Sequence, residues 1–246
     1  MIGKNLVDFL NEELKEYNIV EKLMYLSDGH PDKVVFTTSF GYEDQVITDL
    51  IFSNNIEINV VTLDTGRLFE ETYKVYRSTL EKYGKPIKAY FPPTEKVEQL
   101  LAEKGPFSFY ESLENRKECC FIRKVIPLKR ALAGNEIWIT GLRASQSEYR
   151  SDLHEFEWDE GNQIIKFNPL LDWSLEQTID YVKENNVPYN VLHDRGFVSI
   201  GCEPCTRAIR PGEDFRAGRW WWEQNSGKEC GLHETKASTG LSAGGE

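Results

Sequence analysis

Five cysteines are the residues of this 246-residue chain whose types and spacing point most directly to chemistry. Cys119 and Cys120 are adjacent, Cys202 and Cys205 form a Cys-Glu-Pro-Cys segment, and Cys230 stands alone near the C-terminus. An odd number of cysteines argues against a disulfide framework in a chain that is not exported. The two pairs therefore predict a four-thiolate metal site, with one thiol left over for another task.

The metal of such a site stays open at this point. Four thiolates can hold zinc or an iron-sulfur cluster, and the ligand set alone does not distinguish the two. Structural zinc sites usually pair two knuckles with short spacers, and the missing spacer between Cys119 and Cys120 is awkward for such a knuckle. The spacing thus disfavours zinc without excluding it. A buried quartet of free thiols is the remaining alternative.

The loop SFGYED at residues 39–44 could bind an anion. Its small residues would let backbone N-H groups approach a phosphate, and a following helix would add partial positive charge. It has neither the lysine of a Walker A loop nor the three glycines of a dinucleotide fingerprint. The alternative is an ordinary helix cap, in which Ser39 or Asp44 satisfies first-turn amides. The turn Asp64-Thr65-Gly66 is equally ambiguous when taken alone.

These loops belong to a pattern of strands that alternate with helices. Helical periodicity is found at residues 5–26, 46–51, 68–76 and 175–182, and β-rich runs at residues 34–38, 56–63, 87–91 and 136–140. The alternation predicts an α/β fold with a single doubly wound, mostly parallel sheet. Ligands bind beyond the carboxyl ends of such strands, so the loops at 39–44, 64–66 and 141–150 should converge on one site.

Composition excludes several classes of protein. Hydrophobic residues make up 40% of the chain, which is enough to bury a core. A net charge of −11 has the wrong sign for a protein that coats nucleic acid, so an anionic ligand would need a local basic pocket. No apolar run is long enough for a membrane span, and the N-terminal residues lack the basic region of a signal peptide. We expect a soluble, cytoplasmic protein, for which a homo-oligomer is one possible assembly.

The order of motifs along the chain resembles a known family. The segments SFGYED, LDTGRLFEETY, CCFIRKVIPL, TGLRASQSEYR, GCEPCTR, GRWWW and KECGLH follow one another from about Phe36 to His233. In this order they are similar to the assimilatory sulfonucleotide reductases, and within them to the iron-sulfur branch that reduces adenosine 5'-phosphosulfate (APS). The resemblance implies an adenine nucleotide alpha hydrolase-like (PP-loop) fold. It also implies a nucleotide-binding domain with the cluster site over residues 1–210 and a mobile segment with the catalytic cysteine over 211–235. Residues 236–246 are expected to be disordered.

The resemblance implies a role for each cysteine. The two pairs would ligate a 4Fe-4S cluster through Cys119, Cys120, Cys202 and Cys205. The Cys230 thiolate would attack the sulfur of APS, expel AMP and form a cysteine S-sulfonate. Reduced thioredoxin or glutaredoxin would then release sulfite, because no further cysteine stands beside Cys230 to resolve the intermediate.

The substrate would be held by loop residues and by placed cations. Lys124 would lie near both the cluster and the sulfate, and arginines would suit the oxyanions because of their fixed fork of donors. Trp220, Trp221 and Trp222 are expected to pack the C-terminal segment. The complete set of expected substrate-binding residues is Ser39, Phe40, Gly41, Asp44, Leu63, Asp64, Thr65, Gly66, Lys124, Gly141, Arg143, Arg150, Arg216, Arg219 and His233.

One segment departs from the family pattern. Many relatives carry a basic and then an acidic residue after Gly-Leu-Arg, whereas this chain has Ala144-Ser145. The departure leaves the charge balance near the sulfate, and hence substrate preference, open. Rival functions are a reductase for 3'-phosphoadenosine phosphosulfate (PAPS), a noncatalytic zinc-stabilised nucleotide-binding module, and an ATP pyrophosphatase or tRNA-thiolating enzyme.

Overall fold

The fold is built on one six-stranded sheet, seen in a computed structural model that describes residues 2–146 and 153–223. The strand order is β3-β2-β1-β4-β6-β5, and every neighbouring pair is parallel except β5 with β6. The predicted single, mostly parallel sheet is therefore confirmed. The strands are β1 (Val34–Thr38), β2 (Asn59–Leu63), β3 (Lys88–Tyr90), β4 (Ile137–Ile139), β5 (Phe156–Asp159) and β6 (Ile164–Phe167).

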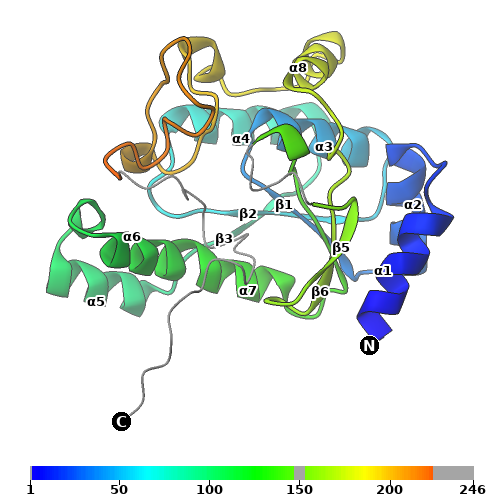
Figure 1. The fold of residues 1–246 in the computed structure, drawn as a ribbon, viewed down its shortest axis with the longest axis horizontal. Coiled ribbons are helices and arrows are strands. Elements are labelled where there is room, and N and C mark those ends of the chain that lie inside the picture. Colours follow the sequence, from blue (N-terminus) through cyan, green and yellow to red (C-terminus); the bar gives the residue numbers. More distant parts are fainter. Residues whose placement is uncertain (1, 147–152, 224–246) are drawn as a thin grey trace.

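Helices cover both faces of the sheet, with α3 and α4 on one face and α5, α6 and α7 on the other (Figure 1). Such double coverage is what parallel strands require, because crossovers return over alternate faces. The helices are α1 (Ile2–Glu13), α2 (Ile19–Gly29), α3 (Tyr42–Ser53), α4 (Glu70–Tyr83), α5 (Thr94–Lys104), α6 (Leu113–Cys120), α7 (Ile126–Leu132) and α8 (Leu175–Glu184).

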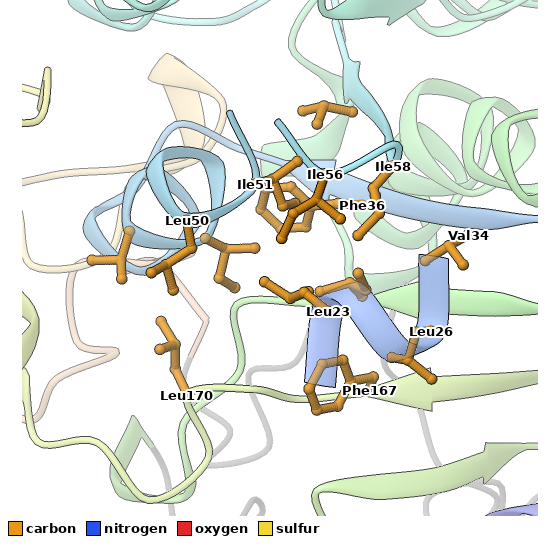
Figure 2. Close-up of a cluster of buried hydrophobic side chains, with 14 of the residues drawn as sticks. Leu23, Leu26, Val34, Phe36, Leu50, Ile51, Ile56, Ile58, Phe167 and Leu170 are labelled. Atoms are coloured by element: carbon orange, nitrogen blue, oxygen red, sulfur yellow. The ribbon is translucent and has the colours of Figure 1, made fainter. Parts of the chain in front are cut away.

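Alternation along the strands divides the core into two layers. In β1, Val34 and Phe36 face one hydrophobic cluster, whereas Val35 faces the other. The larger cluster lies between the sheet and α2 and α3, where Leu23 and Ile51 pack near Phe36 (Figure 2). The period of two in a strand places successive side chains on opposite faces, so Val34, Val35 and Phe36 are all apolar because both faces of β1 are buried.

The N-terminal helix differs from the prediction. A single helix over residues 5–26 is wrong, because α1 ends at Glu13 and α2 begins at Ile19. Asn18 explains the break: its side chain accepts from the Glu21 amide, and the Glu21 carboxylate accepts from the Asn18 amide. This capping box starts a new helix. The apolar spacing continues across the break, which is why the sequence predicted a single helix.

The hairpin of β5 and β6 was not predicted from the sequence. Its two strands are short and carry charged residues, including Lys166, which is buried. The Lys166 ammonium lies 2.7 Å from a carboxylate oxygen of Glu157, its directly opposite partner across the strands. The pair compensates the burial of both charges, which is why a strand with a central lysine can lie next to β4.

The part of the C-terminal segment that is described, residues 211–223, returns to the body of the protein. The Arg207 amide donates to the Gly218 carbonyl, and Thr206 forms an isolated bridge with Arg219. The division into residues 1–210, 211–235 and 236–246 stays a prediction. Among the described helices, none combines the length and the apolar character that a membrane crossing needs.

Candidate active site

A cavity of about 230 Å³ opens beyond the carboxyl ends of β1, β2 and β4. Its wall includes Ser39 after β1, Thr65 after β2 and Gly141 after β4. The three loops that were expected to converge do line one cavity, as far as they are described, because the strands that precede them are neighbours in the sheet.

The expected substrate-binding residues divide into three groups. Several line the cavity: Ser39, Gly41, Asp44, Leu63, Thr65, Lys124, Gly141, Arg216 and Arg219. Four others are not part of the lining: Phe40, Asp64 and Arg143 are buried, and Gly66 is exposed. Arg150 and His233 lie outside the described residues, as does the expected nucleophile Cys230.

The loop after β1 keeps the start of α3 open. Gly41 is the N-cap of α3 and no side chain caps it among the described residues, so the alternative of an ordinary helix cap is not realised. Asp44 instead accepts hydrogen bonds from the Ser39 amide and the Ser39 hydroxyl. Burial raises the pKa of Asp44 to about 6. Phe40 adopts a left-handed φ of 62° and turns its ring onto Tyr76 in the core.

Gly141 permits a close contact between the end of β4 and the first turn of α3. A Cβ at this position would overlap Oδ1 of Asp44 and lie 3.2 Å from Cβ of Glu43. Asp44 is buried and accepts two hydrogen bonds from Ser39, so its carboxylate cannot turn away without breaking them. Glycine is therefore required here by space, not by backbone conformation.

Substitution of Gly141 tests this contact. Gly141→Ala should lower the free energy of unfolding by about 1–3 kcal/mol, because the added methyl overpacks the wall of the cavity. It should also weaken nucleotide binding, since the turn with Asp44 must move. Denaturant unfolding and AMP titration measure the two effects. Gly29→Ala is the matched control, because a Cβ there meets nothing within 4 Å; equal behaviour of the two variants would contradict the account.

Arg143 is held by a carboxylate of the cavity wall. Its Nε lies 2.7 Å from Oε1 of Glu43, and its guanidinium also donates to the Ser145 hydroxyl at 2.6 Å. Gln146 donates to the same Glu43 oxygen at 2.9 Å. Both Arg143 and Glu43 are nearly excluded from solvent, so this pair fixes the Glu43 side chain beside the cavity. Ser145, part of the segment that departs from the family pattern, is thus one of the partners of Arg143.

A π-helical turn carries Lys124 to the cavity. The segment η2 (Phe121–Val125) joins α6 to α7, and the Ile126 amide donates to the Phe121 carbonyl five residues earlier. Pro127 lacks the N-H that would bind the carbonyl of Arg123 in a regular helix, which explains the wider turn at this place. Lys124 lines the cavity, whereas Arg123 is buried and donates to the Thr65 carbonyl.

The four described cysteines gather beside the same cavity. Cys119, Cys202 and Cys205 are buried in one cluster, Cys120 is half-buried, and none forms a disulfide with another described residue. The Cys202 sulfur lies 3.2 Å from the hydroxyl of Thr65, a residue of the cavity wall. The sequence pairs 119–120 and 202–205 are therefore brought together by the fold.

The electrostatics of these cysteines suit thiolates bound to a cation. Burial, together with the nearby Cys202, raises the pKa of Cys205 to about 12, whereas Arg219 and Lys124 oppose the shift. Burial also raises the pKa of Cys119. Unbound thiols in this setting stay protonated and inert, whereas coordination to a metal would deprotonate them. The donor set thus fits a sulfur-ligated metal group.

Within the described ranges, no group of three or more cysteine, histidine or acidic side chains is arranged to hold one metal ion. A single zinc requires four sulfurs at about 2.3 Å from one point. An iron-sulfur cluster distributes its cysteines over several irons and needs a wider separation of sulfurs.

Arginines of the C-terminal segment complete the wall. Arg219 is buried, its guanidinium lies 4.9 Å from the Trp220 ring centroid, and its Nε has no partner among the described residues. Arg216 also lines the cavity. Trp220 is buried in the cysteine cluster, as expected of a packing residue, whereas Trp221 is 41% exposed.

Among the residues of the wall that were not singled out from the sequence are Glu43 and His193. Glu43 lies within the loop SFGYED, and its place directly after a strand could have identified it as a residue of the site. His193 comes from the 3-10 turn η5 (His193–Arg195), far along the chain and after no strand. No spacing rule would have found it, because only the return of the chain after α8 brings it to Tyr42.

Comparison with known proteins agrees with the motif order. The model of the phosphoadenosine phosphosulfate reductase domain matches residues 33–208. A protein of Burkholderia cepacia named adenosine 5'-phosphosulfate reductase is 52% identical over 213 residues, which cover 87% of this chain and 85% of that protein. One of the same name from Agrobacterium fabrum is 48% identical over 224 residues, covering 91% and 86%. The resemblance inferred from the motifs is confirmed.

Solved structures agree with the sheet topology. A phosphoadenylyl-sulfate (PAPS) reductase from Candida auris, crystallised with phosphate, superposes with a TM-score of 0.68 and 32% identity, covering 82% of this chain and 96% of that one. The FMN adenylyltransferase of Candida glabrata gives a TM-score of 0.50 at 14% identity, covering 95% and 85%. The second likeness concerns the fold alone.

Proposed function

The chain belongs to the phosphoadenosine phosphosulfate reductase domain family, and on this premise we propose that it reduces APS to sulfite and AMP in sulfate assimilation. The relatives that are about half identical over most of both chains are named for this substrate. The structural observation that carries the proposal is the cavity that joins an open helix start, placed cations and four gathered cysteines.

The proposed reaction has three covalent steps. The Cys230 thiolate attacks the sulfur of APS, the bond from that sulfur to the bridging oxygen of the phosphate breaks, and AMP leaves with the electron pair. A thiolate of reduced thioredoxin or glutaredoxin then attacks Sγ of Cys230, and sulfite leaves with the electrons of the sulfur-sulfur bond. The second thiol of the donor resolves the mixed disulfide, so the donor supplies both electrons.

The wall residues would bind the two halves of the substrate. Lys124, Arg216 and Arg219 supply positive charge for the phosphate and sulfate, which a protein of net charge −11 cannot provide over its general surface. The uncapped first turn of α3 adds backbone amides as hydrogen-bond donors for the substrate. His233 and Arg150 are proposed to join these cations. Arg143 would act by holding Glu43 in place and not by direct contact with the substrate.

We propose that Cys119, Cys120, Cys202 and Cys205 hold a 4Fe-4S cluster. When bound, such a cluster would tie α6 to the segment of residues 202–205 and place a fixed charge distribution beside the cavity. Lys124 and Arg219 both line the cavity and act electrostatically on Cys205, so they couple the two sites. The cytoplasm, where thiols are kept reduced, is the proposed compartment.

Steady-state turnover tests the substrate assignment. Anaerobically purified protein with reduced thioredoxin should release sulfite and AMP from APS, and PAPS should react more slowly. A higher kcat/KM for PAPS would favour the second candidate, a PAPS reductase, for which the likeness to the Candida auris enzyme is the specific observation. No sulfite from either nucleotide would contradict both.

A further inference from the structure

His193 is a polar side chain in the cavity wall that the proposed reaction does not use. Its ring stacks on Tyr42, with centroids 4.0 Å apart and 16° between the planes. Its Nδ1 lies 2.7 Å from the carbonyl oxygen of Phe197. Its Nε2 is buried and has no hydrogen-bond partner among the described residues.

The contact with Phe197 decides which ring nitrogen carries the proton. A carbonyl oxygen only accepts, so Nδ1 of His193 must be the donor. Burial lowers the pKa of His193, with Glu43 and Asp194 opposing the shift, so the ring is neutral at pH 7. Nε2 therefore presents a lone pair. A buried acceptor without a donor is destabilising, so a bound ligand with a donor would relieve this cost.

The chemistry of the cavity indicates which part of a nucleotide supplies that donor. Ionised phosphate and sulfate oxygens only accept hydrogen bonds, so they cannot satisfy Nε2 of His193. The cations Lys124 and Arg219 lower the pKa of Cys205, whereas the carboxylate of Glu43 raises the pKa of His193. The cavity thus has a cationic part beside the cysteines and an acceptor-rich part beside α3. Ribose hydroxyls and the adenine amino group are the donors of the nucleoside.

We propose that Nε2 of His193 accepts a hydrogen bond from an O-H or N-H group of the nucleoside half of the substrate, an inference that rests on the proposed function. The stacked Tyr42 and the carbonyl of Phe197 hold the ring so that this lone pair is fixed before the ligand arrives. His193 then orients the nucleoside while the cations hold the phosphosulfate. This contact would fix the direction in which the nucleotide lies in the cavity.

Nucleotide analogues test the contact without chemistry at sulfur. His193→Phe keeps a flat ring for Tyr42 and removes the acceptor, so the Kd for AMP should rise about 5- to 50-fold in calorimetric titrations. The same titrations are made with 2'-deoxy-AMP, 3'-deoxy-AMP and inosine 5'-monophosphate. For the one analogue that lacks the donor, native protein and variant should bind equally.

Two further variants separate binding from folding. His193→Gln retains an acceptor oxygen and should recover part of the affinity for AMP. His30→Phe makes the same replacement at a histidine whose partner is Glu136, outside the cavity, and should bind AMP as the native protein does. Unchanged AMP affinity in His193→Phe, or an equal loss for all four nucleotides, would overturn the inference. Failure of the native protein to bind AMP would instead contradict the proposed function, and the inference with it.

Discussion

Replacement of Cys230 by serine should reduce sulfite formation from APS by at least about a thousandfold while leaving AMP binding and bound iron unchanged. A serine hydroxyl is protonated at neutral pH and is a far weaker nucleophile toward sulfur than a thiolate. The assay combines sulfite release with reduced thioredoxin, AMP titration and iron analysis on one preparation. Retention of turnover in Cys230→Ser would remove this residue as the nucleophile.

Replacement of a cysteine beside the cavity should, unlike Cys230→Ser, remove bound iron. Cys205→Ala should lose most of the bound iron and lower the thermal unfolding midpoint, because metal binding and folding are coupled. Cys205 is buried against Cys202 and Trp220, so its sulfur contributes to the packing of this cluster as well. Activity should fall with the iron, since the neighbouring Lys124 and Thr65 line the substrate cavity.

Each of these two variants is the control for the other. Cys230→Ser should keep full iron and a native unfolding midpoint. Loss of iron from Cys205→Ala would then be specific to Cys205 and not a general effect of removing a cysteine. Full iron occupancy in Cys205→Ala would exclude this residue as a ligand. Zinc in place of iron and sulfide in the native protein would favour the zinc-stabilised nucleotide-binding module.

The central strands could be predicted because their residues leave few alternatives. Val34, Val35 and Phe36 form an unbroken apolar run, which a strand buried on both faces requires. The hairpin of β5 and β6 escaped prediction because its stability depends on the pairing of Glu157 with Lys166, which is visible only once the strands are side by side. The capping box at Asn18 was present in the sequence, but the apolar pattern on either side of it obscured the break.

The site was predictable in its topology and less so in its contacts. Convergence of the loops follows from the order of parallel strands, and the sequence alone indicated it. The partner of Arg143 could not be inferred, because an arginine fork suits a carboxylate of the protein as well as an oxyanion of a ligand. His193 reaches the cavity through a turn whose position depends on the packing of α8 against α3.

The covalent intermediate is the most direct test of the proposed function. Prereduced, anaerobically purified protein is mixed with APS, and separately with PAPS, in the absence of any thiol donor. The intact mass and the peptide that contains Cys230 are then measured. We predict one sulfonate group per chain from APS, located on Cys230. No adduct from either nucleotide, in folded protein that retains its metal, would contradict the account.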